Sequence, residues 1–341
     1  MNARVAAILV LLLAVLGGGA LLYQHQERAR RPDNVGTLGK ALFKDLQAAD
    51  IAAIRIVEPN AALTLKREEQ RWVIAERGNF PADLSKVREF VLKVIGLKVG
   101  QSEPIGEKDR ARLNLDGSGT RIEFKAADEK ALGAFVVGRK YFKREVETPD
   151  KAIADGRFIS LPGEAGTAYL VGDPLTQATV KTAEWIDRSS FQVEKVKTLQ
   201  VRYPEGEAWR IDRPADNAEW NLAGLKPGEK LDISRANAAS YSLSLLELAD
   251  VAPKDAADTG LDKPISIDAA TLEGAAYAIK VGRLVNNNYY VTVAASGLKP
   301  DAKDAERVKL LSQHVLLIPK SKLEDTLKKR SELLEKKAGT K

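Results

Sequence analysis

The sequence predicts an α+β fold in which two duplicated modules, each an antiparallel β-sheet with a helix, follow one N-terminal transmembrane helix. Three observations predict it. An uncharged apolar run covers Val5 to Tyr23, short strand patterns alternate with turn signals from Ile51, and a Leu-Asp pair followed by Val-Gly-Arg occurs twice. The chain of 341 residues is long enough for two domains, each with its own core.

The N-terminal apolar run has the length of a membrane span. Val5 to Tyr23 contains nineteen residues, against the roughly twenty that a helix needs to cross about 30 Å of hydrocarbon. Arginines lie on both sides of the run, so charge does not decide its orientation. The alternative is a cleaved signal peptide ending at the small residues Gly17 to Ala20, but the apolar run continues beyond them. We expect an anchor with a basic flank over 1–31 and a tether over 32–50.

The first module is expected over residues 51–185. Strand patterns at Ile51 to Val57, around Leu63 and at Trp72 to Ile74 predict a three-stranded meander. A helix is expected to begin at Asp83, whose side chain can accept hydrogen bonds from the free amides of a first turn. Its apolar face is predicted to consist of Leu84, Val87, Val91 and Val94.

The second module is expected over 186–341 with the same order of elements. Its meander is predicted from Leu199 to Val201, Trp209 to Ile211 and Trp220 to Leu222, and its helix begins at Asp232. The sequence predicts that the module closes with a basic C-terminal helix over Lys322 to Glu335.

The two Leu-Asp elements and the two Val-Gly-Arg elements are the clearest sign of duplication. Leu115-Asp116 precedes Val137-Gly138-Arg139, and Leu261-Asp262 precedes Val281-Gly282-Arg283. The offset between matched positions drifts only from 149 at the helix starts to 144 at Val-Gly-Arg. Agreement in the same order along both halves favours an internal repeat over coincidence.

Several of these features resemble a known bacterial family, the domain of unknown function numbered 4340 (DUF4340). The resemblance rests on the N-terminal span, the opening from Ile54 to Asp83, the Leu-Asp element, and EWIDRSSFQVEKVKTLQV from Glu184 to Val201. It implies a membrane-anchored envelope protein encoded beside the permease, ATPase and gliding-type auxiliary subunits of an ABC transporter. The family has no assigned catalytic residues, so the resemblance implies none here.

Composition and charge exclude several functional classes. The formal net charge is +6, but +3 lies in residues 1–31 and +4 in residues 320–341. A nucleic-acid-binding protein carries its basic surface on the folded domain, so we expect no nucleic-acid partner. The chain contains no cysteine, which excludes disulfides, thiol chemistry and Cys-based metal sites.

Few residues suggest catalysis. His25 and His314 have no His or Cys neighbour at metal-ligand spacing, so both are interpreted as polar surface residues. Asp116 and Asp262 stand at strand entries beside turn residues and are interpreted as turn or capping groups. We therefore expect a protein that is not an enzyme and has no cofactor or metal.

Candidate partner-binding residues follow from exposed turn positions. Arg139 and Arg283 end strand patterns, where a pair of related arginines could face an anionic partner. Tyr289 and Tyr290 follow the predicted hairpin tip Asn286 to Asn288 and could contact a partner.

The leading functional interpretation is a non-enzymatic protein of the inner membrane whose periplasmic ectodomain binds another protein, an accessory component of an ABC-type transporter complex. Two alternatives stay open. A cell-envelope hydrolase would need a catalytic constellation in a deep pocket. A solute-binding receptor would hold its ligand between the repeats, near Asp173 to Ser190.

Overall fold

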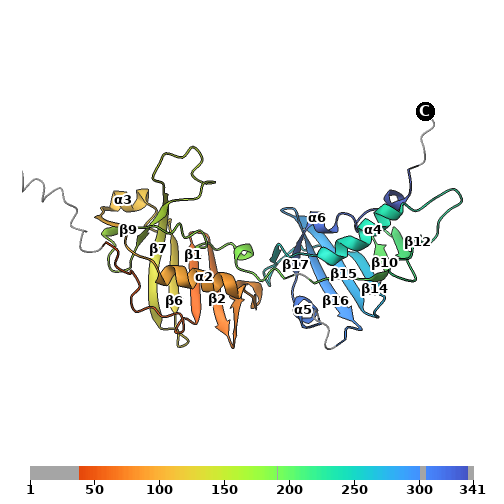
Figure 1. The fold of residues 1–341 in the computed structure, drawn as a ribbon, viewed down its shortest axis with the longest axis horizontal. Helices are drawn as coiled ribbons and strands as arrows, with labels where there is room; N and C mark the ends of the chain where they lie inside the picture. Colours follow the sequence, from red (N-terminus) through yellow and green to blue (C-terminus); the bar gives the residue numbers. More distant parts are fainter. Residues whose placement is uncertain (1–37, 190, 300–304, 337–341) are drawn as a thin grey trace, which may run out of the picture. The chain divides into compact units, whose positions relative to one another are not determined.

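The computed structural model describes residues 38–189, 191–299 and 305–336 (Figure 1). These residues form an α+β fold with two antiparallel β-sheets and a few helices, as the sequence predicts. The transmembrane helix expected at Val5 to Tyr23 lies outside the described residues, and so does His25. No helix within the described ranges is long and apolar enough to cross a membrane.

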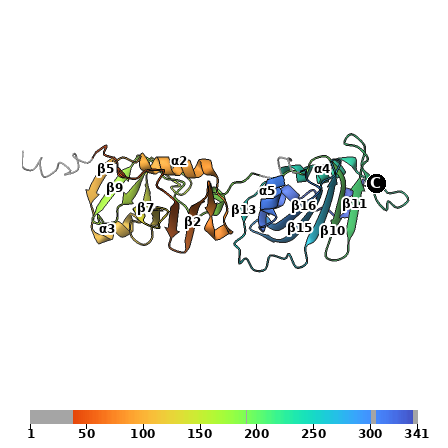
Figure 2. The ribbon, with the colours of Figure 1, turned by 90° about the horizontal axis from the view of Figure 1, so that it is seen from below.

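The first sheet has nine strands in the order β4-β3-β2-β1-β6-β7-β8-β9-β5. Its strands are β1 (Ala53–Glu58), β2 (Ala61–Glu68), β3 (Arg71–Ile74), β4 (Phe80–Pro81), β5 (Gln101–Pro104), β6 (Thr120–Lys125), β7 (Ala131–Tyr141), β8 (Gly156–Ser160) and β9 (Thr167–Val171). The helical elements of this region are η1 (Ala75–Arg77), α2 (Leu84–Ile95), α3 (Glu107–Arg112) and η2 (Thr182–Glu184). Helices α2 and α3 lie on opposite faces of the sheet (Figure 2).

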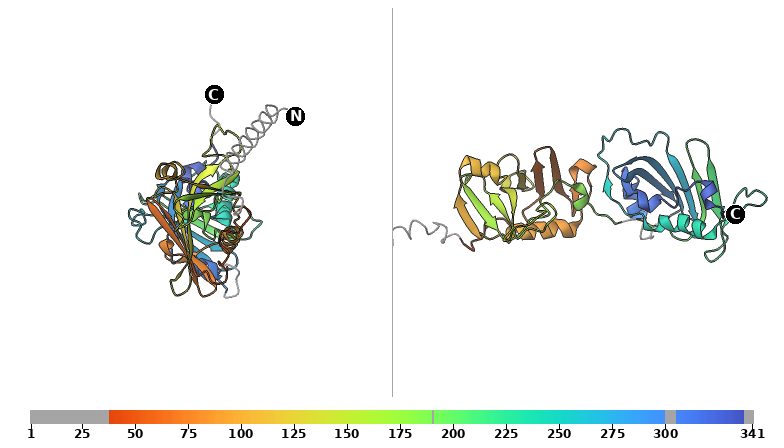
Figure 3. Two further views of the ribbon diagram at one scale, coloured as in Figure 1. Left: turned by 90° about the vertical axis from the view of Figure 1, so that its left-hand side faces the viewer. Right: turned by 90° about the horizontal axis from the view of Figure 1, so that it is seen from above.

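The second sheet has eight strands in the order β12-β11-β10-β14-β15-β16-β17-β13. Its strands are β10 (Val196–Arg202), β11 (Ala208–Asp212), β12 (Asn221–Leu222), β13 (Asp250–Val251), β14 (Ile265–Thr271), β15 (Ala276–Val285), β16 (Asn288–Ser296) and β17 (Leu316–Pro319). Its helical elements are α4 (Ile233–Tyr241), η3 (Ser242–Leu245), α5 (Ala305–Leu311), α6 (Lys320–Leu323) and η4 (Arg330–Leu333). Helix α4, teal in Figure 3, runs along one face of this sheet.

The two sheets share one strand order. In each, a meander of three strands pairs through its first strand with a second set of antiparallel strands, and a short strand that follows the helix in sequence closes the far edge. Strand β4 is the additional member of the first sheet.

Both helices that follow the meanders begin where the sequence predicts. The Asp83 carboxylate accepts hydrogen bonds from the amides of Ser85, at 2.9 Å, and Lys86, at 3.3 Å. Asp232 is the N-cap of α4 and accepts from the amide of Arg235. An oxygen acceptor at this position satisfies amides that the first turn leaves free.

The buried face of α2 differs from the predicted one in two positions, since it lacks Leu84 and includes Phe90. Val87, Phe90, Val91 and Val94 are buried and follow the i, i+3, i+4, i+7 spacing of an amphipathic helix. Leu84 was expected on this face but is 59% exposed, because the buried stripe begins one turn later, at Val87.

The described residues form two compact units, and each has its own core. The first unit comprises residues 38–51, Ile56–Asn60 and Phe90–Ala178, and the second comprises Ala52–Arg55, Ala61–Glu89 and the chain from Thr179. Aromatic rings run through the first core, with centroid distances of 5.1 Å for Phe43–Phe135, 6.3 Å for Phe124–Phe135 and 6.4 Å for Phe90–Phe124. In the second unit the core includes fully buried residues from α4, from η3 and directly after η3: Ala236, Leu243 and Leu246.

The prediction of a continuous C-terminal helix over Lys322 to Glu335 is wrong. The structure has two short helical elements there, α6 and η4, separated by an irregular stretch. The carbonyl of Leu327 accepts from the Tyr203 hydroxyl and that of Lys328 from the Trp209 indole, both at 2.7 Å. These carbonyls bind side chains of β10–β11 and so do not take part in a regular helix.

Each Val-Gly-Arg element forms a β-bulge. In the β7–β8 pair the register shifts between Val137 and Lys140, so that Gly138 and Arg139 lie opposite one residue, Phe158. In the β15–β16 pair it shifts between Val281 and Leu284, so that Gly282 and Arg283 lie opposite Tyr290. Two residues facing one is the definition of a bulge.

Glycine is required in both bulges because a loop backbone crosses the strand there. The Arg139 amide donates to the Leu113 carbonyl at 2.8 Å, and the Arg283 amide donates to the Thr259 carbonyl at 2.7 Å. A Cβ on Gly138 would lie 2.3 Å from the Leu113 oxygen, and one on Gly282 would lie 2.2 Å from the Thr259 oxygen. The repeated Val-Gly-Arg motif thus marks the place where a loop backbone crosses the strand.

We expect Gly138→Ala and Gly282→Ala each to lower the free energy of unfolding by about 1–3 kcal/mol, because the added methyl must displace a backbone carbonyl. Urea unfolding followed by circular dichroism measures this. Gly117→Ala is the matched control, since a Cβ at Gly117 meets nothing within 4 Å. If both variants were as stable as Gly117→Ala, the close approach of the loop carbonyl would not require glycine at these positions.

Candidate functional site

The first unit contains a pocket of about 810 Å³ at the end of β7 and the start of β8, here called the β7–β8 pocket. Its walls come from α3, from the bulge, and from the loop of residues 142–155 that joins β7 to β8. This loop projects beyond the end of β7 (Figure 1). The pocket is thus formed by segments close to the first Val-Gly-Arg bulge.

Lys140 holds the joining loop in place. Its ammonium donates to the carbonyls of Pro149, Asp150 and Ala152 at 3.0, 2.9 and 3.2 Å. Three backbone acceptors match the three donors of a lysine ammonium. The charge of Lys140 is solvated by backbone dipoles, and no carboxylate within the described part of the chain forms an ion pair with it.

Arg157 is the unusual residue of this pocket. It lies directly opposite Lys140 in the β7–β8 register. Its Nε atom is buried and has no hydrogen-bond partner, and the described residues offer its guanidinium no ion pair. Burial lowers the pKa of Arg157 from its ordinary value because desolvation disfavours the charged form. Like charges opposite each other on neighbouring strands are destabilising, so the repulsion between Lys140 and Arg157 destabilises the fold locally.

The remaining charges of the pocket are mixed. Arg112 is paired with Asp109 at 3.2 Å. Four other cations and three other carboxylates line the pocket, namely Arg139, Lys140, Arg144, Arg157, Glu103, Glu145 and Asp150. Within the described ranges no ion pair joins any of these seven side chains. Cations therefore exceed carboxylates by one.

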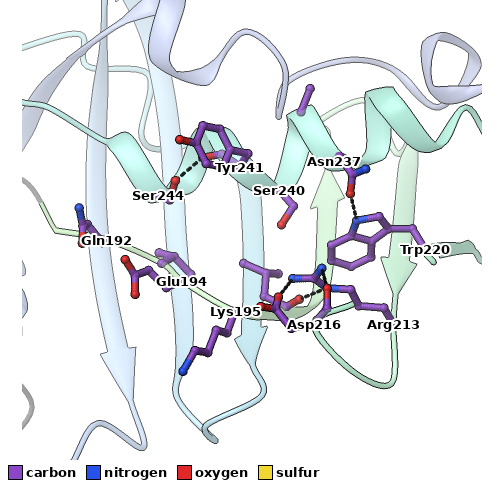
Figure 4. A pocket seen from close by; sticks show the side chains of 13 residues that line it. Gln192, Glu194, Lys195, Arg213, Asp216, Trp220, Asn237, Ser240, Tyr241 and Ser244 are labelled. Carbon is purple, nitrogen blue, oxygen red and sulfur yellow. Dashed lines mark hydrogen bonds and ion pairs between the residues drawn. The ribbon is translucent and has the colours of Figure 1, made fainter. Parts of the chain in front are cut away.

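A second pocket, of about 780 Å³, lies beside α4 in the second unit (Figure 4). The cation at the centre of this pocket, Arg213, has hydrogen-bond partners and an ion pair. The Arg213 guanidinium donates to the Val196 carbonyl at 2.8 Å and to Asp216, and it lies 4.5 Å from the ring centroid of Trp220. The Trp220 indole donates to Asn237 at 2.9 Å. These contacts give Arg213, Asp216 and Trp220 a structural role.

The structure places the four predicted partner-binding residues at the two bulges. Arg139 is exposed and lines the β7–β8 pocket. Arg283 is exposed at the equivalent bulge of the second sheet, where Tyr290 lies opposite the bulge and Tyr289 opposite Leu284. Consecutive strand residues point to opposite faces, so Tyr289 and Tyr290 do not share one surface.

The hairpin tip is confirmed but is shorter than predicted. Asn286 and Asn287 have φ values of 45° and 64°, and β16 begins at Asn288. Positive φ at both central residues is typical of a two-residue hairpin turn, a conformation that Asn tolerates. The two tyrosines are partly buried within β16 and do not stand at the exposed tip.

Of the residues weighed for catalysis, Asp116 has a clear local structural role. Asp116 accepts hydrogen bonds from the amide and the hydroxyl of Ser118, which lower the pKa of its carboxyl, as expected of a turn residue. Asp262 is exposed in the equivalent loop. His314 was expected at the surface but is partly buried, with its ring edge against Phe80 at a centroid distance of 5.1 Å. In the described ranges no three His, Asp or Glu side chains are placed to hold a metal ion.

Sequence reasoning missed Lys140 and Arg157. Neither belongs to a repeated motif, and the pocket that they line depends on the loop of residues 142–155. The signal available in the sequence was a difference between the halves, since a long charged segment follows the first Val-Gly-Arg where a short Asn-rich turn follows the second.

The fold and the pocket define a protein with two antiparallel sheets and a loop-walled site on the first. Residues 72–264, more than half of the chain, match the family described as "Domain of unknown function (DUF4340)". The chain belongs to this family. No curated protein and no solved structure matches it significantly.

The partly buried His314 predicts a pH dependence of stability. Burial lowers the pKa of His314 below its ordinary value near 6.5, because desolvation disfavours the imidazolium. As the pH falls below about 6.5, His314 takes up a proton more readily in the unfolded chain than in the folded chain. Protonation therefore favours the unfolded state, and the free energy of unfolding decreases as the pH falls below that value.

We expect His314→Gln to reduce the loss of stability between pH 7 and pH 5.5, as measured by urea unfolding. All other titrating groups are the same in the wild-type chain and the variant, so the difference between their two pH profiles reports on position 314. An unchanged pH dependence in the variant would show that the folded state does not disfavour the protonated ring.

Proposed function

We propose that the chain is a non-enzymatic envelope protein, held in the inner membrane by Val5 to Tyr23, whose periplasmic ectodomain binds another protein. The proposed partner is a subunit of an ABC-type transporter complex, for which this chain is an accessory component. The membrane anchor rests on the spanning length of the apolar run. The transporter link rests on the family resemblance.

The observation that carries the binding proposal is the surface at the second bulge. Arg283 is exposed, and the described residues provide no ion pair for its guanidinium. Its backbone is fixed by the hydrogen bond to Thr259. Tyr290, which is partly buried, lies opposite the bulge. An arginine without an ion pair among the described residues, held on a fixed backbone beside a partly buried tyrosine, has the composition of an interface hot spot.

We also propose that the two sheet regions are duplicated modules. Support comes from the shared strand order, from the equivalent bulges, and from the helix caps at Asp83 and Asp232. Trp72 in β3 and Trp220 directly before β12 occupy matching places in the two meanders. The same backbone crossing in both modules explains why Val-Gly-Arg was retained twice.

The binding proposal is tested by isolating the full chain from its native membrane and identifying the proteins that co-purify. We expect Arg283→Ala and Tyr290→Ala each to reduce the recovered transporter subunit at least fivefold while the fold is retained, because both remove anchors of the contact. Lys280→Ala is the matched control, since Lys280 is exposed on the same strand. Recovery equal to that of the control would remove Arg283 and Tyr290 from the interface.

The anchor proposal has its own test. We expect N-terminal sequencing of the mature protein to find residues 5–23 still present, because the apolar run continues past its small-residue cluster. A mature chain that begins near Ala20 or Leu21 would identify a cleaved signal peptide.

A further inference from the structure

We propose that the β7–β8 pocket binds the carboxylate of a small ligand with an apolar body, and that Arg157 is the residue that anchors this carboxylate.

The first step of the argument is that Arg157 lacks a counterion. Its Nε atom is buried without a hydrogen-bond partner, although most buried polar atoms in folded proteins have one. Its neighbour across the strands is another cation, Lys140. Arg157 is partly buried, and a charge that is partly removed from water without a partner carries a desolvation cost. An anion bound between the guanidinium and the pocket walls would offset that cost.

The second step concerns the kind of anion. A guanidinium presents its donors as a planar fork that matches both carboxylates and phosphates. Glu103, Glu145 and Asp150 also line this pocket, and cations exceed carboxylates by only one. A single negative charge balances that excess, whereas a phosphate dianion would leave the pocket with a net negative charge. The charge composition therefore favours a carboxylate.

The third step concerns the rest of the ligand. Tyr141, Phe142 and Phe158 line the same pocket, and the rings of Tyr141 and Phe158 meet edge to face with centroids 5.9 Å apart. The volume of about 810 Å³ lies within the range of ligand sites, roughly 300–1,000 Å³. Aromatic side chains beside a guanidinium without an ion pair suit a molecule with an apolar body and one acidic group.

This site is independent of the proposed protein contact at Arg283. Every residue that lines the pocket belongs to the first unit, and Arg283 belongs to the second. A variant of one site therefore leaves the other intact, so the two proposals can fail separately.

The test is calorimetric titration of the purified full-length chain with N-acetylphenylalanine, which has one carboxylate and one aromatic ring. The matched neutral probe is its amide, N-acetylphenylalaninamide, and inorganic phosphate is the third probe. We expect the acid to bind and the amide and phosphate to bind at least tenfold more weakly. A tripeptide ending in phenylalanine distinguishes a peptide terminus from a free small acid as the source of the carboxylate.

Variants then assign the anchor. We expect Arg157→Gln to weaken binding of the acid at least tenfold, since a charge-assisted pair is lost. Arg157→Lys retains the charge without the fork and should bind with intermediate affinity. Arg121→Gln is the matched control, because Arg121 is exposed, pairs with Glu123 and lies outside the pocket.

Three results would overturn the proposal. They are equal binding of the acid and its amide, tighter binding of phosphate than of the acid, and unchanged affinity in folded Arg157→Gln. If Arg157→Gln does not fold, the comparison of acid with amide and the affinity of Arg157→Lys decide the question.

Discussion

A carbonyl of a preceding loop crosses a central strand at a glycine in both sheets, and much of the surrounding structure depends on this crossing. Leu113 and Thr259 supply the carbonyls, which accept hydrogen bonds from the amides of Arg139 and Arg283. The crossing explains the register shift that follows in each strand. The bulge in turn places an arginine side chain at the surface, where no described acidic residue neutralises it.

The two sheets use the same crossing but continue differently after it. In the second sheet a two-residue turn at Asn286-Asn287 joins β15 directly to β16. In the first sheet the loop of residues 142–155 takes that place and forms walls of the β7–β8 pocket. Long connections on a rigid scaffold carry much of the functional variation between proteins, and this loop gives the first sheet pocket walls that the two-residue turn does not provide.

Features set by local sequence were predictable, and those that depend on distant backbone were not. The helix starts at Asp83 and Asp232 follow from capping chemistry within a few residues. The prediction of a continuous C-terminal helix was wrong because the carbonyls of Leu327 and Lys328 accept hydrogen bonds from Tyr203 and Trp209, which are remote in sequence. Likewise nothing local to Arg157 indicates that it lacks a counterion, since that depends on which side chains the fold brings near it.

Lys140 binds the joining loop through main-chain oxygens alone. Every residue has a carbonyl, so this attachment does not require any particular side chain at positions 149–152. The loop can therefore accumulate substitutions that change the chemistry of the pocket without losing its anchorage to β7. In evolutionary terms, retention of this one ammonium would be enough to keep the loop attached while its side chains change.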